Sequence, residues 1–478
     1  MQVDPEALAI PRLRRALGTS DLVLLNIAAI VGLRWFSNAA QAGPAGLTLW
    51  LLAAATFFLP SGLAVLELSS RIPHEGGLYL WSRAAFGDLH GFVVGWAYWV
   101  SNLVFFPSLL LFTSGVFLHV GGHSWLALAE SPLYNAVFCL VLLWGATLLN
   151  ILGLRRAKWL QNLGGIATLV VVTLMLVGGA IAWHEFGAAT PMTAASLIPD
   201  LSSVATLGTF GILTLAYDGL ELGPIMGDEI ENPARTVPRS ILISGIAIAL
   251  LYAAGTAALL VALPPGQIDA IDGIPAAMQA IGARVGVPSF GATAAALVAL
   301  GSIGGLSAWI SGTARLPYVV GVGHYLPERL AGIHPKYGTP HVALLAQAGA
   351  TSVVLLAAIS GSAIHEAFVL LIDMTVALTC IVWLYLFASL AVLRHRAAGR
   401  NAGLTLIPGG PTACGLVAAV GIAATTIALA VSLVPPQGSA APRLFLIKGV
   451  GGCVLILGVG VAIYRRGRSR RAAAASRP

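Results

Sequence analysis

The stretch IVGLRWF, residues 30–36, places a glycine and an arginine in the middle of an apolar run that covers residues 20–42. A run of this length can cross a bilayer as a helix. An arginine at mid-bilayer costs about 2.5–3.5 kcal/mol on insertion scales, and glycine permits backbone that is not helical. The stretch therefore predicts a membrane-spanning helix that is interrupted near its centre.

The composition of the whole chain agrees with a membrane protein. Of the 478 residues, 58% are hydrophobic and 9% are charged, whereas soluble domains have about 45–50% and 25%. So few charges cannot cover a soluble surface, which excludes a cytosolic enzyme, a nucleic-acid-binding module and a disordered scaffold. The four cysteines lie singly in apolar runs, so we expect neither a disulfide framework nor a metal site.

Twelve apolar runs are long enough to span a bilayer. They are continuous rather than alternating, so they read as helices and not as strands of a barrel. We therefore predict an all-α polytopic membrane protein with twelve spans. The predicted spans are residues 20–42, 47–70, 90–119, 132–152, 159–183, 203–227, 239–263, 290–320, 341–359, 363–394, 411–434 and 443–465.

The distribution of Lys and Arg predicts the orientation. Nearly all of the 26 basic residues fall in alternate loops and in the two ends of the chain, the segments 1–19 and 466–478. Basic loops stay in the cytoplasm, so both termini are expected there. The net charge of +7 then faces the anionic lipid of the inner leaflet, and no nucleic acid is needed to explain it. We expect the polar tail after residue 465 to be disordered.

A second interrupted run resembles the first. The sixth run contains YDGLE at residues 217–221, followed by a Gly-Pro pair, and the first run also continues into a Gly-Pro pair. The two runs are five apart, which predicts two five-helix repeats, 20–183 and 203–394, followed by the pair 411–465. Transporters built from inverted repeats bind substrate where two such helices lose their hydrogen bonds. Backbone amides freed at such a break favour a carboxylate, and freed carbonyls favour a cation, so a site that offers both suits an amino acid.

Three cytoplasmic motifs carry a family resemblance: PHEGGLY at 73–79, DEIENPARTVP at 228–238, and the segment 315–340, which ends in KYGTP. With them the chain resembles the amino acid–polyamine–organocation superfamily of transporters. The segments SAWISG (307–312), IPGG (407–410) and SLVPP (432–436) are most similar to bacterial glutamate:GABA antiporters. The resemblance implies the leucine-transporter fold, with alternating access to one central site.

The resemblance also implies a set of substrate-binding residues. The first span is expected to meet the substrate carboxylate and the sixth its amino group, with wall contacts from spans three and eight. This chain departs from the family in having arginine where the first break usually has a second glycine, and in having no lysine inside span five. The implied residues are Ile30, Val31, Gly32, Leu33, Arg34, Trp35, Asn102, Ala216, Tyr217, Asp218, Gly219, Leu220 and Trp309.

Two interpretations of Arg34 stay open at this point. Its guanidinium either binds a substrate carboxylate or forms a permanent salt bridge with Asp218 or Glu221. Asp218 and Glu221, three residues apart, would share one face of a helix. These two carboxyls and Asp373 in the tenth span are the candidates for proton coupling.

We therefore predict a secondary transporter of amino acids in a bacterial inner membrane, working as an exchanger or with protons. The alternative is a polyamine or cationic amine carrier of the same fold, favoured if the two acids face an empty site and Arg34 turns away. A membrane enzyme and a channel are disfavoured, because the runs hold no Ser/His/Asp grouping and no repeated filter segment. No cofactor is expected, and the oligomeric state is not indicated.

Overall fold

The computed structural model describes residues 15–322, 325–361, 364–396, 407–434 and 442–475. Within these ranges the regular structure is helical, apart from one isolated bridge between Leu17 and Ile230. Many large apolar side chains on the outward faces of the helices are exposed, for example Leu133 of one helix and Leu242 of another. An apolar exterior around a packed interior is what a lipid environment selects, so the predicted all-α membrane class is confirmed.

The helices follow one another along the whole described chain. They are α1 (Thr19–Ile30), α2 (Arg34–Gln41), α3 (Ala45–Ala53), α4 (Leu59–Arg71), α5 (Gly77–Phe86), α6 (Asp88–Leu118), α7 (His123–Leu126), α8 (Pro132–Ile151), α9 (Leu154–Phe186), α10 (Val204–Ala216), α11 (Leu222–Ile225), α12 (Pro233–Ala262), α13 (Gly273–Val285), α14 (Phe290–Thr313), α15 (Arg315–Val322), α16 (His341–Gly361), α17 (Ile364–Arg396), α18 (Gly410–Ser432) and α19 (Pro442–Ala475). A π-helical turn, Ala54–Phe58, joins α3 to α4.

Each of the twelve predicted spans coincides with a helix or with a broken helix. In the described residues, 10 helices are long and apolar enough to cross a membrane, and the pair α1 and α2, bent by 48°, makes an eleventh span. The predicted span 203–227 contains the short apolar helix α10, then an unwound segment, then α11. Length alone therefore finds eleven spans, because the sixth is divided by its break.

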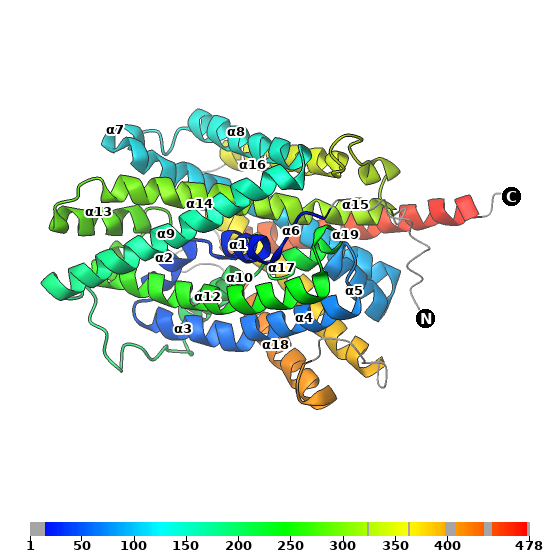
Figure 1. Ribbon diagram of the computed structural model, residues 1–478, viewed down its shortest axis with the longest axis horizontal. Coiled ribbons are helices and arrows are strands. Elements are labelled where there is room, and N and C mark those ends of the chain that lie inside the picture. Colours follow the sequence, from blue (N-terminus) through cyan, green and yellow to red (C-terminus); the bar gives the residue numbers. More distant parts are fainter. Residues whose placement is uncertain (1–14, 323–324, 362–363, 397–406, 435–441, 476–478) are drawn as a thin grey trace.

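The segments predicted to share one side of the membrane lie at one end of the bundle. Figure 1 shows α5, α15 and the end of α19 on the right, and α7 and α13 toward the left. The division into two repeats and the cytoplasmic placement of the termini stay predictions.

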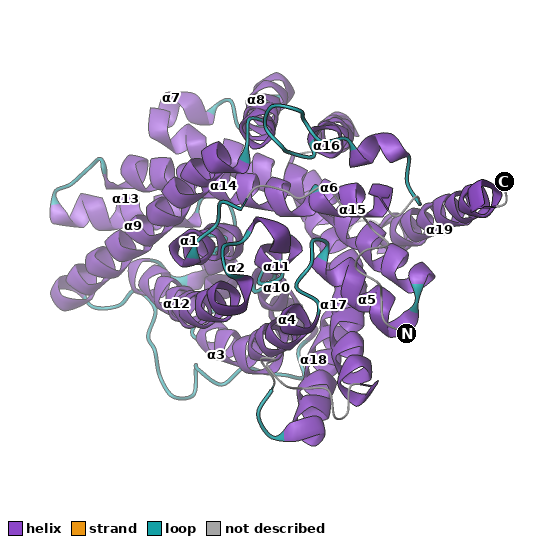
Figure 2. Ribbon diagram, turned by 45° about the vertical axis from the view of Figure 1, so that its right-hand side comes forward, coloured by secondary structure: helices purple, strands orange, loops and turns teal. Residues whose placement is uncertain are grey.

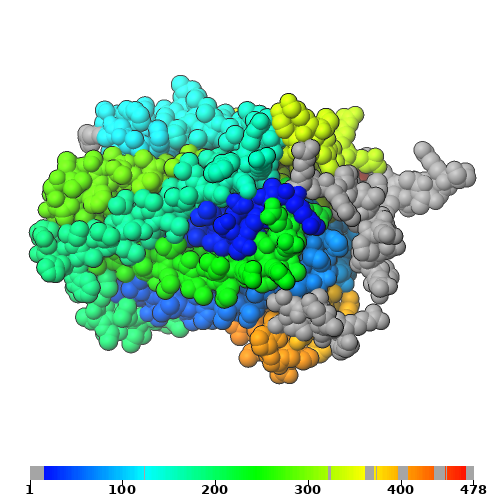
Figure 3. Space-filling view, in the orientation of Figure 1, coloured from blue at the N-terminus to red at the C-terminus, as the bar shows by residue number. Residues whose placement is uncertain are grey.

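The two broken helices occupy the middle of the bundle. Figure 2 shows α1, α2, α10 and α11 surrounded by α4, α12, α14 and α17. Helix α2 contacts α10, and α1 contacts α11. In the space-filling view the beginning of α1, in dark blue, reaches the surface between α9 and α12 (Figure 3).

Glycine lets α14 approach α1 closely. A Cβ atom on Gly305 would lie 2.4 Å from the carbonyl oxygen of Ala28, so no larger residue fits at this crossing. Small residues at helix crossings are the usual way in which membrane helices pack closely. The first break is therefore held against the rigid α14.

Two segments are helical where no helix was predicted. The segment after the second predicted span forms α5, and most of α5 is buried against the bundle, including Tyr79 and Trp81. The tail that was expected to be disordered continues α19 as far as Ala475.

Candidate functional site

The first break lies between Ile30, where α1 ends, and Arg34, where α2 begins. The amide of Val31 still donates to the carbonyl of Ile27 at 2.9 Å. Among the described residues, the amides of Leu33 and Arg34 have no hydrogen-bond acceptor. The N-terminus of a helix concentrates positive partial charge on such amides, so the start of α2 is suited to a carboxylate.

The second break lies between Ala216, where α10 ends, and Leu222, where α11 begins. Gly219 has a φ of +129°, which other residues rarely adopt. A Cβ atom there would lie 2.8 Å from Cγ1 of Ile30 and 3.3 Å from the ring of Trp309. Glycine is therefore required at this position both by backbone conformation and by space, and it brings the second break against the first.

Tyr252 of α12 joins the two breaks. Its hydroxyl lies within donating range of the carbonyl of Ile30 and, at 2.7 Å, of the carbonyl of Ala216. The amide of Gly32 donates to the same hydroxyl at 3.3 Å. Sequence analysis missed this residue, although a phenol inside an apolar run needs a buried hydrogen-bond partner and was a usable signal.

Next to the breaks is a small cavity, which we call the Asp218 cavity. It brings together six of the residues that the resemblance implied, from spans one, three, six and eight. It also includes residues that sequence analysis did not single out, among them two threonines of α17. Its lining is Ala29, Ile30, Trp35, Ser101, Asn102, Phe105, Leu215, Ala216, Asp218, Trp309, Thr375 and Thr379.

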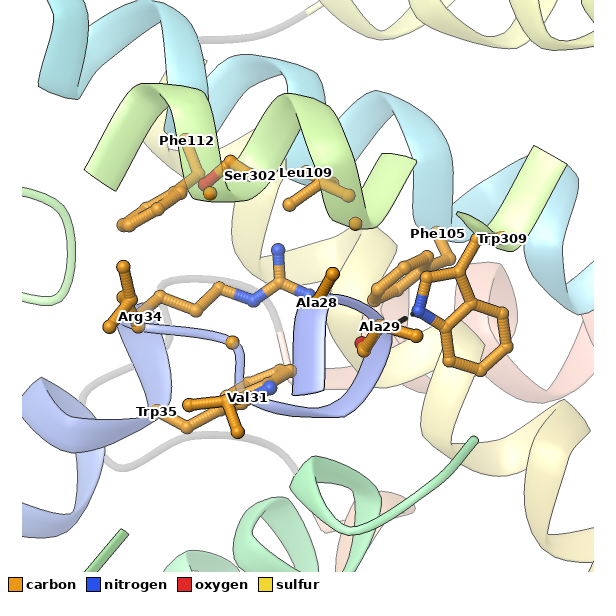
Figure 4. Close-up of a pocket in the computed structure, with 14 residues that line it drawn as sticks. Ala28, Ala29, Val31, Arg34, Trp35, Phe105, Leu109, Phe112, Ser302 and Trp309 are labelled. Carbon is orange, nitrogen blue, oxygen red and sulfur yellow. Dashed lines mark hydrogen bonds between the residues drawn. The ribbon is translucent and has the colours of Figure 1, made fainter. Parts of the chain in front are cut away.

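A second small cavity surrounds the side chain of Arg34, and we call it the Arg34 cavity. Figure 4 shows the guanidinium reaching across it, with Trp35 on one side and with Phe112, Leu109 and Ser302 on the other. The two cavities share part of their walls. The Arg34 cavity is lined by Ala28, Ala29, Val31, Gly32, Leu33, Arg34, Trp35, Phe105, Leu109, Phe112, Gly301, Ser302, Gly305 and Trp309.

The guanidinium of Arg34 is buried, and no described residue pairs with its charge. The residue is 2% exposed, and its Nε and Nη1 atoms have no hydrogen-bond partner. Its guanidinium carbon lies 4.2 Å from the ring centre of Trp35 and 4.9 Å from that of Phe105. A permanent salt bridge with Asp218 or Glu221, the second interpretation from the sequence, is wrong for the described residues, because these acids are held elsewhere.

The two acids of the second break lie together, but not as predicted. The chain from Tyr217 to Glu221 is not helical, so helical spacing does not align them. The unwound backbone instead brings the carboxyl groups of Asp218 and Glu221 into contact.

Each of these acids is also bonded to another helix. Trp383 of α17 donates to Asp218 at 2.7 Å. Tyr98 of α6 donates to Glu221 at 2.5 Å, and the amide of Gly219 donates to the same carboxyl at 3.3 Å. The acid pair is therefore anchored on two sides, with Asp218 alone reaching the cavity.

Some predicted residues are not brought into either cavity. Tyr217 packs on Trp50 and Phe58, and Leu220 lies near Gly62. The side chain of Asp373 lies outside the described residues. No group of three His, Cys, Asp or Glu side chains in the described part of the chain is placed to hold a metal ion.

A second buried arginine lies at the end of the bundle that carries α5. Arg315 bonds to Glu229 through Nη2 at 2.6 Å and through Nε at 2.8 Å, and its Nε lies 3.7 Å from Glu75. Its Nη1 also donates to the carbonyl of Ser311. Burial and the neighbouring Glu229 raise the pKa of the Glu75 carboxyl, while Arg315 opposes that rise.

Comparison with known proteins places the chain among membrane transporters. A family model described as amino acid permease matches residues 17–459. An uncharacterized transporter of Legionella pneumophila is 28% identical over 93% of this chain and 95% of its own length. A glutamate/gamma-aminobutyrate antiporter of Lactococcus lactis is 26% identical, covering 82% of this chain and 78% of the relative.

The fold also has a solved counterpart. The crystal structure of a manganese transporter from Eremococcus coleocola aligns with a TM-score of 0.60 at 14% identity, covering 97% of this chain and 99% of that chain. At this identity the likeness concerns the fold alone. Since the family and these relatives are transporters, the chain is a transporter and not an enzyme. It belongs to the amino acid permease family, within the amino acid–polyamine–organocation superfamily.

Proposed function

We propose that the protein is a secondary active transporter that carries amino acids across a bacterial inner membrane by alternating access. The observation that carries the proposal is the meeting of two helix breaks at the hydroxyl of Tyr252. Beside that meeting point lies a cavity that both breaks line. A site built from two half-helices exposes opposite partial charges to one small molecule.

The substrate carboxylate is assigned to the start of α2. The free amides of Leu33 and Arg34 supply two donors, and the guanidinium of Arg34 supplies a charge with two unpartnered nitrogens. Arginine binds a carboxylate through two parallel hydrogen bonds. This supports the first interpretation of Arg34.

The substrate ammonium is assigned to the Asp218 cavity. Asp218 offers a carboxyl there, Asn102 lines the cavity, and Trp309 forms part of the wall that the two cavities share. The indole of Trp309 is held by a 2.8 Å hydrogen bond to the carbonyl of Ala29. Trp309 is thereby placed to close over a bound substrate.

The transport cycle is proposed to run as exchange or with a proton. Asp218 and Glu221 interact in a buried site, and two carboxyls so placed bind one proton between them. Binding of an ammonium group next to Asp218 would favour release of that proton. Asp373 remains a further candidate for proton transfer.

The alternative substrate is a polyamine or cationic amine. Two observations count against it: the acids hold each other, Trp383 and Tyr98 rather than facing an empty site, and Arg34 reaches into a cavity. A buried guanidinium without a partner repels a dication and attracts an anion.

Counterflow in proteoliposomes tests this function. Proteoliposomes that contain the purified protein are loaded with each unlabelled amino acid in turn, and with putrescine. Uptake of the same compound in labelled form is then followed with and without a pH gradient. We expect accumulation with one or more amino acids and none with putrescine. Accumulation with putrescine alone would favour the amine carrier instead.

A matched variant tests the site in the same assay. Asp218→Asn keeps the shape of the side chain and its bond to Trp383 but removes the negative charge. We expect it to abolish accumulation. Thr209→Ala serves as the control, because Thr209 is a half-buried residue of α10 whose hydroxyl bonds only to its own helix. Unchanged accumulation by Asp218→Asn would contradict the assigned ammonium site.

A further inference from the structure

The charge of Arg34 is buried inside the bundle, beside the Arg34 cavity. The residue is 2% exposed and two of its three guanidinium nitrogens have no hydrogen-bond partner. A buried ion is strongly unfavourable unless an opposite charge lies near it. Cation–π contacts with the rings of Trp35 and Phe105 offset only a small part of the hydration free energy that the guanidinium loses on burial. The substrate-free protein therefore needs an anion at this place.

The described residues do not supply that anion. Asp218 lines the other cavity and accepts a hydrogen bond from Trp383. Glu221 lines neither cavity and is bonded to Tyr98. Within the part of the chain that the structure describes, no side chain neutralises Arg34, and an anion from solution can take that place.

The lining of the Arg34 cavity selects an anion over a cation. Apart from the guanidinium, the polar side chains on it are the hydroxyl of Ser302 and the indole N–H groups of Trp35 and Trp309. The carbonyl of Ala29 is already occupied by the indole of Trp309 at 2.8 Å. The other walls are apolar, with Leu109 and Phe112 facing the guanidinium (Figure 4). The hydroxyl of Ser302 and the indole N–H of Trp35 are thus available as donors there, and no carboxylate is among the described residues that line the cavity.

We propose that the Arg34 cavity binds a small monovalent inorganic anion, of the size of chloride, in the substrate-free protein. The carboxylate of an arriving substrate displaces it, so the anion competes with the substrate. The displacement rests on the proposed function, whereas the binding of the anion does not.

Thermal unfolding of the purified full chain in detergent tests the binding. Melting is measured in sodium chloride and in sodium gluconate at equal ionic strength. We expect the melting temperature to be higher by a few degrees in chloride, rising with chloride concentration and then saturating. In Arg34→Gln the difference between the two salts should vanish. No difference in the wild type would overturn the proposal.

A matched control separates this site from general salt effects. Arg394 is also buried, but it already bonds to Glu67 at 3.1 Å. Arg394→Gln should melt at a lower temperature and keep the full chloride response. An equal chloride response in Arg34→Gln and in the wild type would place the anion elsewhere and overturn the proposal.

A second measurement works even where Arg34→Gln does not fold. Iodide quenches tryptophan fluorescence on contact, and Trp35 lies against the guanidinium. We expect wild-type fluorescence to fall with iodide and to recover in part when chloride is added, and we expect the part that chloride restores to be lost in Trp35→Phe. Quenching that chloride leaves unchanged would contradict a shared site.

Transport kinetics test the displacement. With an amino acid that accumulates in counterflow, chloride in place of gluconate should raise KM several-fold and leave the maximal rate unchanged. An unchanged KM would overturn the competition. If no amino acid accumulates but chloride still raises the melting temperature, the proposed function fails while the anion site stands.

Discussion

Arg34 and Arg315 are both almost fully buried, and their surroundings are opposite. Arg315, at the end of the bundle, has two bonds to Glu229, one carbonyl acceptor and Glu75 nearby. Arg34, at the first break, has two aromatic faces and two nitrogens without a partner. Both residues are at most 2% exposed.

The difference distinguishes a buried arginine with a structural role from one with a role in binding. A buried guanidinium whose hydrogen bonds are satisfied within the chain ties segments together: Arg315 joins α15 to the segments before α5 and after α11. A buried guanidinium that is left unsatisfied is unstable by itself and becomes stable when an anion arrives. The following variants break or sharpen this contrast.

The largest effect is expected on folding, at Arg315. Arg315→Gln leaves Glu229 buried without its cation, which costs about 3–5 kcal/mol of the free energy of unfolding. Thermal melting in detergent measures it. Arg235→Gln, at an exposed arginine, should change stability by no more than about 0.5 kcal/mol. Equal melting of Arg315→Gln and the wild type would remove the contrast.

The next effect is expected on transport, at Arg34. Arg34→Gln removes the charge that binds the carboxylate, which costs about 2–5 kcal/mol of binding free energy and lowers counterflow at least about thirty-fold. Its melting temperature in gluconate should change less than that of Arg315→Gln, because no ion pair is broken. Near-normal uptake of every amino acid by Arg34→Gln would refute the assignment.

A smaller effect is expected where the two breaks meet. Tyr252→Phe removes the hydroxyl shared by the carbonyls of Ile30 and Ala216. The carbonyl of Ile30 keeps the amide of Gly32 as a donor, so the loss falls on the buried carbonyl of Ala216. A buried acceptor that loses its donor costs about 1–3 kcal/mol, and both melting and counterflow should show it. Tyr217→Phe is the control, because its hydroxyl makes only a 3.4 Å bond to the carbonyl of Trp50. Equal losses in the two variants would show that Tyr252 has no special role.

The smallest effect concerns the pH dependence of stability near Arg315. Burial and Glu229 raise the pKa of Glu75, so its carboxyl holds a proton more tightly in the folded than in the unfolded chain. The stabilisation that the protonated Glu75 carboxyl gives to the folded chain is fully present below its pKa in the unfolded chain, about 4.3. It is lost as the pH rises through its pKa in the folded chain.

Glu75→Gln tests that sign. The variant is neutral at every pH, so its melting temperature should fall less than that of the wild type between about pH 5 and pH 8. The difference should be small, because Arg315 opposes the rise of the pKa. A steeper fall of the melting temperature in Glu75→Gln than in the wild type would contradict a raised pKa of Glu75 in the folded chain.

Much of the fold was predictable because its signals are local. The length of apolar runs located the spans, and the paired charge and glycine in YDGLE indicated the second break before any contact was known. Glu67 and Arg71 illustrate such a local signal, because residues four apart on a helix are neighbours, and they form an ion pair at 2.7 Å. By contrast, the contact of Asp218 with Glu221 was expected from helical spacing, and it arises instead from unwound backbone.

The remaining site residues depend on long-range packing. Tyr252 reaches the first break from a position more than two hundred residues away, and nothing in its own run says which carbonyls it faces. Thr375 and Thr379 of α17 reach the Asp218 cavity in the same way. Such contacts follow from how helices cross, which the order of residues within one helix does not contain.

The sequence by itself determined that this chain lies in a membrane, that its spans are helices, and that two of them break, because burial in lipid and backbone hydrogen bonding act on neighbouring residues. Only the tertiary structure decided the partners of the charges. The sequence of one helix does not show whether its arginine meets a carboxylate from another segment. Among the described residues, Arg315 meets one and Arg34 does not.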